Sequence, residues 1–359
     1  MLFLLTLALS VAATTSQSDT SPSVIVCKLG ISRDQLLTFP IRSGYPTDPL
    51  SVDSPYVVDM VVDTGATHDL IFDPRVQAEK RNSYSVSPDG GEIKFQTFVV
   101  EQRGFNTVPF ITVACNVPVI IPQSSVTMAA ALKQDPGEPI QGIVGFNQDS
   151  LRDKTLFLTN AMPDWKSLAI EFPPVLQPGS GSNAMVIMKQ SGNIRGNTEG
   201  PYMHVNSKHY WSTVVTELKV GDDVVIDPPK GKKITVVFDT GSNYFGASAG
   251  ILNAIQDAIA DGKLGLTIET AAYGDINTDS KPYSVTMRFP SNSWGNFDKR
   301  LNRNFIVEKI DESGFDDLST HEIILIGTRG LRGKKMSIFV KDSPPKSGEF
   351  AISIGNSIT

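Results

Sequence analysis

Two short motifs place carboxylates in the same sequence setting. Asp63-Thr64-Gly65 follows the apolar run 60–62, and Asp239-Thr240-Gly241 follows the apolar run 236–238. An Asp at the end of a buried strand is partly desolvated, and two such carboxylates that face each other share one proton. The charged member can take a proton from a bound water, while the neutral member protonates a carbonyl. The pair predicts hydrolysis at a carbonyl group by an activated water, with Asp63 and Asp239 as catalytic carboxylates and with no metal or cofactor.

The residues after each Asp suit the support of such a dyad. Gly65 and Gly241 let backbone N–H groups approach the carboxylates closely, because glycine has no side chain. The hydroxyls of Thr64 and Thr240 can bond across to the other half and fix the geometry. We therefore expect all four to support the dyad.

The fourth position of the two motifs differs. Ser242 can donate a hydrogen bond to the outer oxygen of Asp239 and stabilise its charged form. Ala66, at the same place in the first motif, has no hydroxyl. The two carboxylates are therefore expected to be unequal, with Asp63 holding the shared proton more often.

Each motif also has a partner downstream. Two apolar residues and a glycine recur at 143–145 in the first half and at 325–327 in the second. One Asp-Thr-Gly would arise by chance in roughly one chain of this length in ten. Two copies with similar partners are much rarer, so the sequence predicts a duplicated structural unit rather than two unrelated turns.

The remaining pattern is mostly β. Short runs rich in β-branched and aromatic residues predict strands at Val24–Val26, Leu36–Ile41, Tyr56–Val62, Ile93–Val100, Phe110–Ala114 and Val117–Ile121. Helical periodicity is found at Ala249–Ile259, with Ser248 as the N-cap, and a shorter helix is expected at Asp164–Ile170. The predicted fold class is mainly β.

The segment Pro173–Asn183 is rich in Pro, Gly and Ser and lies near the middle of the chain. We interpret it as a linker between two similar halves; the alternative is a long surface loop within one domain. The predicted organisation is a signal peptide over residues 1–13, an N-terminal β lobe over 24–180 and a C-terminal β lobe over 181–359.

The motifs and their surroundings resemble the pepsin-like aspartic proteases over nearly the whole mature chain. Besides the two motifs, the similar segments are Gln141–Phe146, Phe157–Phe172, Tyr210–Trp211, Val214–Val220, Asp239–Gly262, Glu322–Val340 and Gly348–Gly355. The resemblance implies a bilobal pepsin-like acid protease fold, with two pseudo-symmetric β lobes and a central cleft. It further implies a monomer whose peptide or protein substrate lies extended in that cleft, across both aspartates.

Several features depart from the family's pattern. Ala66 stands where a hydroxyl residue is usual, and Thr328 stands where the family usually has Asp. The two cysteines, Cys27 and Cys115, cannot form the family's three disulfides; they could pair with each other or remain buried thiols.

The substrate-covering hairpin, or flap, is expected at Asn82–Phe98, after a short connecting segment. Its turn would contain Asp89 and Gly90. Tyr84 is the candidate flap tyrosine, and a tyrosine in the core of a strand is the alternative.

The N-terminal segment and the net charge bear on the localisation and the partners of the protein. Leu2–Ala13 is an uncharged apolar run of signal-peptide length, for which a buried N-terminal segment is the alternative. No later run is long enough for a membrane anchor. The formal charge of −6 argues against nucleic acid as a partner. We expect a protein that is secreted or lies in an acidic endomembrane compartment, such as a vacuole or lysosome.

The histidines and the clusters of basic residues give weaker indications of function. The four histidines have no zinc-binding spacing. The basic clusters are interpreted as solvated loops, with a docking site for an acidic partner as the alternative; they comprise Lys230, Lys232 and Lys233, and Arg329, Arg332, Lys334 and Lys335.

Two rival functions remain beside a secreted aspartic endopeptidase. The first is a catalytically weak or inactive protein of the same fold that binds or inhibits peptides or proteins. The intact motifs argue against it, and the short flap region argues for it. The second is a β-protein that binds a small molecule or sugar, which the internal repeat disfavours.

Overall fold

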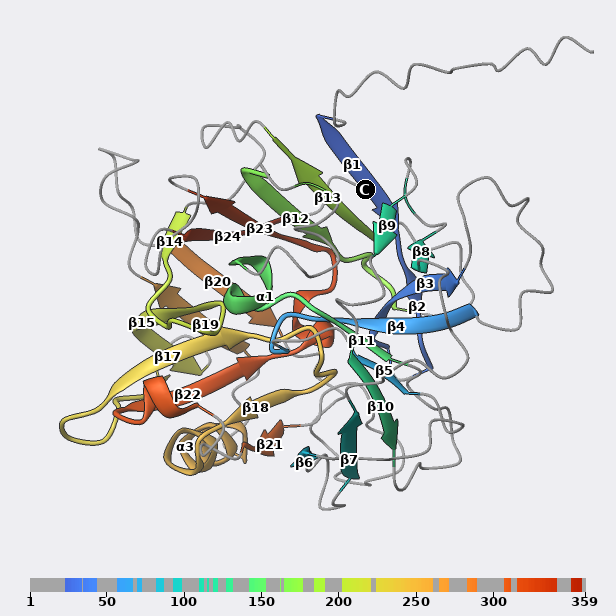
Figure 1. Cartoon of the computed structure of the whole chain (residues 1–359). Coiled ribbons are helices and arrows are strands. Elements are labelled where there is room, and N and C mark those ends of the chain that lie inside the picture. The colour runs from blue at the N-terminus through green and yellow to red at the C-terminus, as the bar shows by residue number, and fades with distance from the viewer. Residues whose placement is uncertain are drawn as a thin grey trace, which may run out of the picture.

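The computed structural model is mainly β (Figure 1). It describes residues 23–33, 35–43, 57–66, 70–72, 82–86, 93–98, 110–112, 115, 119–121, 127–131, 142–152, 162, 165–176, 184–190, 202–220, 224–260, 265–270, 283–288, 307–310, 315–340 and 350–356. The predicted signal peptide lies outside these residues. Within them, three sheets account for the fold.

The first part of the chain forms a ten-stranded sheet. Its strands are β2 (Gly30–Ile31), β3 (Leu37–Ser43), β4 (Val57–Asp63), β5 (Leu70–Phe72), β6 (Asn82–Val86), β7 (Ile93–Phe98), β8 (Phe110–Thr112), β9 (Val119–Ile121), β10 (Thr127–Ala131) and β11 (Gly142–Gly145). The spatial order is β6-β7-β10-β5-β11-β4-β3-β8-β9, with β2 on β3. The strand that ends in Asp63 is therefore held on both sides.

The second part forms an eight-stranded sheet. Its strands are β15 (Ser212–Val220), β16 (Val224–Val225), β17 (Lys233–Phe238), β18 (Phe245–Ala247), β19 (Gly265–Thr270), β20 (Tyr283–Arg288), β21 (Val307–Lys309) and β22 (His321–Ile326). The order is β20-β19-β15-β17-β22-β18-β21, with β16 on β15. β17, which leads into Asp239, lies between β15 and β22 and is therefore held on both sides.

The two sheets repeat one arrangement around the aspartate strands. β4 pairs antiparallel with β3 and parallel with β11, and β17 pairs antiparallel with β15 and parallel with β22. The parallel neighbours pair in turn with β5 and β18, both antiparallel. The apolar-apolar-glycine segments found in the sequence are these parallel neighbours. The sequence repeat is thus a repeat of strand arrangement.

A third, six-stranded sheet combines strands from both parts. Its strands are β1 (Val24–Lys28), β12 (Ser167–Glu171), β13 (Met185–Lys189), β14 (Tyr202–His204), β23 (Lys334–Val340) and β24 (Phe350–Asn356), in the order β1-β13-β12-β23-β24-β14. The predicted linker joins β12 to β13, which are antiparallel neighbours in this sheet. The division of the chain at residue 180 remains a prediction.

The helices are short and few among the described residues. α3 (Ala249–Ala260) confirms the expected helix. α1 (Gln148–Arg152) is a helix of five residues that follows β11. Ser248 precedes α3 and its carbonyl accepts from Leu252 N, but its Oγ accepts from Ile323 N on β22 at 2.7 Å. The expected side-chain N-cap bond is therefore replaced by a bond to the sheet.

The helix expected at Asp164–Ile170 is wrong. Residues 167–171 form β12, which lies between β13 and β23. Leu168, Ala169 and Ile170 are all buried, because both faces of this central strand are covered. A strand covered on both faces loses the alternation that marks a strand in sequence, so its apolar run can pass for a helix.

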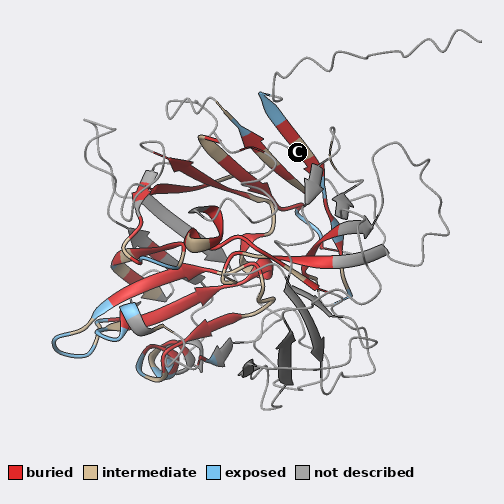
Figure 2. Cartoon of the chain, in the orientation of Figure 1, coloured by how far each residue is buried: buried red, intermediate tan, exposed pale blue. Residues whose placement is uncertain are grey.

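The main hydrophobic core of the described residues draws on all three sheets, and Figure 2 shows the burial of their described strands. Its largest fully buried side chains include Trp211, Phe146, Phe238 and Phe350. A smaller cluster comprises Val237, Ile310, Leu318, Ile323 and Leu325. Cys27 on β1 and Cys115 form a disulfide across 88 positions of sequence, which settles the choice between a bridge and two thiols. The disulfide ties the six-stranded sheet to the segment between β8 and β9.

Candidate active site

The two predicted aspartates stand at equivalent strand ends. β4 ends at Asp63, and Asp239 follows the last residue of β17. The parallel neighbour of each strand fixes its end through the backbone. Phe146 N donates to Asp63 O at 2.7 Å, and Asp239 N donates to Ile326 O at 3.0 Å.

Thr64 and Thr240 join the two motifs through reciprocal hydrogen bonds. Thr64 N donates to Thr240 Oγ1 at 3.0 Å, and Thr240 N donates to Thr64 Oγ1 at 2.9 Å. Each hydroxyl donates onward to the carbonyl of the residue before the opposite Asp. These carbonyls are Phe238 O at 2.9 Å and Val62 O at 2.6 Å. Both threonines are fully buried, so these bonds are sheltered from water.

Each carboxylate lies against the glycine of the opposite motif. A Cβ built on Gly241 would come within 2.4 Å of Asp63 Oδ2. A Cβ on Gly65 would lie 3.0 Å from Asp239 Oδ1 and 3.2 Å from Asp63 Oδ1. Any side chain at Gly241 would collide with Asp63, so glycine is required here for close approach. The arrangement brings the two carboxyl groups into one site.

The hydrogen bonds to the two carboxylates differ. Asp63 Oδ1 accepts from Gly65 N at 2.7 Å and from Ala66 N at 3.0 Å. Asp239 Oδ1 accepts from Gly241 N at 2.9 Å, and its Oδ2 accepts from Ser242 Oγ at 2.7 Å. The side-chain donor expected from the sequence is therefore present at Asp239.

The electrostatics of the pair favour a protonated Asp63. Its pKa is raised well above the usual value, first by burial and then by the neighbouring charge of Asp239. A side-chain hydrogen bond with Asp239 raises the pKa further, while the N–H groups of Gly65 and Ala66 lower it. Two carboxyl groups so placed can hold one proton between them at a pH where an isolated Asp is ionised.

For the predicted flap, the structure describes only the backbone of its two strands. β6 and β7 form an antiparallel hairpin whose register runs from Asn82↔Thr97 to Val86↔Ile93, as the expected hairpin requires. Tyr84 on β6 pairs with Phe95 on β7. Asp89 and Gly90 lie outside the described residues, and the role of Tyr84 remains a prediction.

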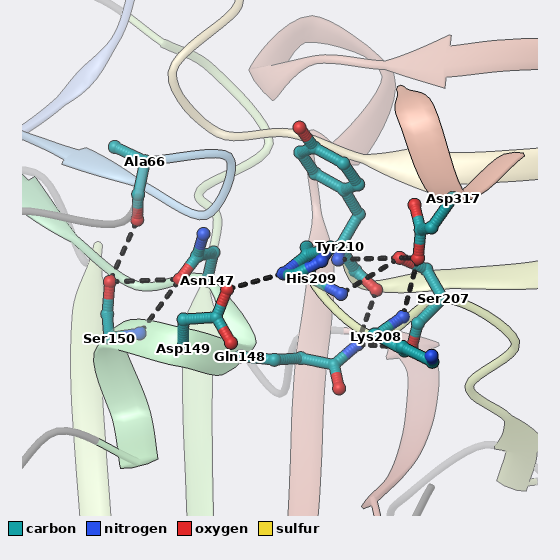
Figure 3. A network of polar contacts seen from close by, with 10 residues as sticks. All are labelled: Ala66, Asn147, Gln148, Asp149, Ser150, Ser207, Lys208, His209, Tyr210 and Asp317. Atoms are coloured by element: carbon teal, nitrogen blue, oxygen red, sulfur yellow. Dashed lines mark hydrogen bonds and ion pairs between the residues drawn. The ribbon is translucent and has the colours of Figure 1, made fainter. Parts of the chain in front are cut away.

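A polar network beside the aspartate loops was not expected from sequence (Figure 3). It connects residues that follow β11, the turn before β15 and the 3₁₀ helix η3 (Asp316–Leu318). In it, Gln148 N donates to His209 O at 3.1 Å, and His209 Nδ1 lies 2.5 Å from Asp149 Oδ2. Ser150 Oγ donates to Ala66 O at 2.9 Å, which attaches the network to the first motif. Most of these bonds use backbone groups, which leave no signal in the sequence.

The sequence predicts that the basic residues after β22 form a solvated loop, and this prediction is wrong. Arg329, on the 3₁₀ helix η4 (Thr328–Leu331), is buried, and so is Lys335. Arg329 Nε and Arg332 Nη2 both donate to Gln35 Oε1, at 2.9 and 2.8 Å. Burial lowers the pKa of Arg332 from its ordinary value.

Gln35 receives a third bond from the same segment. Thr328 Oγ1 donates to Gln35 O at 2.8 Å. Thr328 is the residue that stands where the family that the sequence resembles usually has Asp. Gln35 has a φ of 66°, which is rare for a residue with a side chain. These bonds hold the turn before β3 to the end of the second repeat.

By contrast, the first basic cluster is at the surface, as predicted. Lys230 and Lys233 are exposed. Lys232 Nζ lies 2.7 Å from the buried Glu322 Oε1.

The described residues offer neither a cluster of three His, Cys, Asp or Glu side chains suited to a metal nor a helix long and apolar enough to cross a membrane. Comparison with models of known protein families and with curated proteins finds no match.

Proposed function

We propose that this protein is an aspartic endopeptidase in which Asp63 and Asp239 activate one water molecule. The observation that carries the proposal is the interlocked pair of motifs. Each carboxyl group lies against the glycine of the other motif, and reciprocal bonds between Thr64 and Thr240 hold the two together.

The mechanism follows from the unequal surroundings of the pair. Asp239, bonded by Ser242 Oγ and Gly241 N, carries the negative charge and takes a proton from the water. Asp63, with its raised pKa, carries the proton and donates it to the oxygen of the scissile carbonyl. The water oxygen attacks the carbonyl carbon, so that a neutral tetrahedral diol forms. In the breakdown step the C–N bond breaks as Asp239 gives its proton to the leaving nitrogen and Asp63 takes a proton from a diol hydroxyl. This releases two peptides and restores the starting protonation of the pair.

The finer architecture belongs to this proposal. The ten-stranded and eight-stranded sheets would be the cores of two pseudo-symmetric lobes, with the six-stranded sheet as their common base. A substrate peptide would lie extended between the lobes, under the β6–β7 hairpin. The enzyme would act as a monomer after secretion or in an acidic compartment.

The test is hydrolysis of denatured globin from about pH 3 to 7. Purified protein should cleave it, and a statine-type transition-state analogue should inhibit cleavage. The Asp63→Asn variant serves as the control for a contaminating protease. Tight binding of the analogue without any cleavage at any pH would support the inactive binder instead.

A further inference from the structure

The segment Ser207–Trp211, here named the bridging turn, is bonded to the residues that follow β11. Gln148 Nε2 donates to Tyr210 O at 2.6 Å and to Ser207 O at 2.9 Å. Gln148 is fully buried, and it belongs to α1, in the first repeat. Loss of this amide would leave two carbonyls with one bond fewer inside the protein, which is costly.

Trp211 reaches both aspartate strands from the same turn. Its Nε1 donates to Phe146 O at 2.6 Å, and Phe146 N donates to Asp63 O at 2.7 Å. Its carbonyl accepts from Phe238 N at 2.9 Å, and Phe238 immediately precedes Asp239. A continuous path of three hydrogen bonds therefore runs from one aspartate loop to the other through a fully buried tryptophan.

The bridging turn is itself held in shape, as Figure 3 shows. Ser207 Oγ accepts from His209 N at 3.0 Å and from Tyr210 N at 2.9 Å. Asp317 Oδ2 accepts from Ser207 Oγ and from Lys208 N, each at 2.7 Å. A turn fixed from within and from η3 can transmit a constraint between the elements that it touches.

We propose that the bridging turn fixes the spacing of the two aspartate loops, and that Trp211 and Gln148 are positioning residues for the dyad. The threonine pair holds the loops through the residues after each Asp. The bridging turn holds them through Phe146 and Phe238, on the strand side. Two separate sets of bonds then resist both sliding and rotation of one carboxyl group against the other.

Trp211→Phe tests this proposal. The variant keeps an aromatic ring against Phe350, whose centroid lies 5.1 Å away, but removes the indole donor. A looser pair repels less, so its two apparent pKa values should approach each other by about half a unit. With peptide substrate, kcat should fall about tenfold while KM stays nearly constant, because misplacement of the dyad affects the chemical step.

Trp165→Phe is the matched control. Trp165 is also buried and stacks on the same Phe350, with ring centroids 6.3 Å apart. Among the described residues, its indole makes no hydrogen bond to either aspartate loop. Both variants lose buried indole volume, and Trp211→Phe also loses one buried hydrogen bond. Only Trp211→Phe should change the titration of the dyad.

The readout is a ¹³C NMR titration of protein labelled at the aspartate carboxyl carbons, with Asp63→Asn to assign the pair. The nearby titratable groups are the same in both variants; they are Asp149, Lys208, His209 and Asp317. Gln148→Met, which removes the donors at similar volume, should act like Trp211→Phe and serves if that variant does not fold. Unchanged separation of the two steps in folded Trp211→Phe or Gln148→Met, or an equal change in Trp165→Phe, overturns the proposal.

Only the kinetic part of this inference rests on the proposed function. A wild-type pair that titrates in two coupled steps but cleaves no peptide would reject the endopeptidase and leave the positioning role to be decided by the NMR shifts. Coupled steps that draw together in Trp211→Phe but not in Trp165→Phe would establish the positioning role with or without hydrolysis.

Discussion

Asp63 and Asp239 occupy equivalent strand ends, but the atoms around them are not equivalent. The first has two backbone donors on one oxygen, and the second has a hydroxyl on its other oxygen. The repeat brings the two carboxyl groups together, and the difference between Ala66 and Ser242 makes their surroundings unequal. An acid and a base can therefore arise from the same motif.

Removing either carboxylate should abolish hydrolysis. Asp63→Asn and Asp239→Asn should each lower kcat/KM by at least about a hundredfold, because each deletes one proton-transfer partner. Circular dichroism should remain that of the wild type, since Asn is nearly isosteric. Substantial activity in either folded variant would show that the dyad is assigned to the wrong residues.

The hydroxyl asymmetry should be visible in the pH–rate profile. Ala66→Ser should add a donor that stabilises the charged form of the pair, and so should move the acidic limb of kcat/KM to lower pH. Ser242→Ala should move that limb upward. A charge-assisted bond, partly offset by water, corresponds to a shift of about half to one pH unit. Acidic limbs that stay in place in both variants would contradict the roles given to these two positions.

At the scale of elements, the disulfide between Cys27 and Cys115 is a strong constraint. It joins β1 to a segment of the ten-stranded sheet region across 88 positions. In the chain-entropy description, a loop of this size stabilises the folded state by about 4.6 kcal/mol, and less where the unfolded chain keeps structure. A reductant should therefore lower the urea midpoint of the wild type. The double variant Cys27→Ser/Cys115→Ser should be equally destabilised and insensitive to reductant; an unchanged midpoint in both would show that the bridge does not stabilise the fold.

The elements differ in how far the sequence could predict them. Strands such as β4 and β7 were predicted because a covered face and a solvent face, or a β-branched run, leave a local pattern. β12 was mistaken for a helix because both its faces are buried, and α1 was missed because five residues carry no periodicity.

The residues of the site also differ in how far the sequence could predict them. The aspartates, glycines and threonines could be predicted because their side-chain types are themselves the chemistry. The bonds from Gln148 and Trp211 go to backbone carbonyls, which every sequence possesses, so only the fold could reveal them. The contact of Arg329 and Arg332 with Gln35 joins residues almost 300 positions apart and was equally hidden.

For the whole molecule, the raised pKa of Asp63 links stability to pH. A group whose pKa is raised on folding contributes stability that is fully present below its unfolded pKa and is lost as the pH rises through the folded pKa. For Asp63 this loss begins above the usual value of 3.8 and continues to the raised one. The wild type should therefore become less stable, from this group, between acidic and neutral pH.

Asp63→Asn should remove that part of the dependence. Its melting temperature should exceed that of the wild type near pH 7, and the difference should shrink as the pH falls towards 4, because the wild-type carboxyl group is then protonated too. Differential scanning calorimetry at several pH values measures this directly. A variant that is less stable than the wild type at neutral pH would show that burial of this carboxyl group is not a net cost.

The order of the six-stranded sheet separates the chain cleanly into two contributions. Its strands β1, β13 and β12 come from before Gln190, its strands β14, β24 and β23 come from Tyr202 onward, and the two groups meet at β12 and β23. A cut between these two positions would also leave each of the other two sheets intact on one fragment. We expect the fragments to associate when produced together, and each to bring one aspartate. The molecule is thus organised like a split reporter, in which catalysis would appear only when two pieces, or two proteins fused to them, come together.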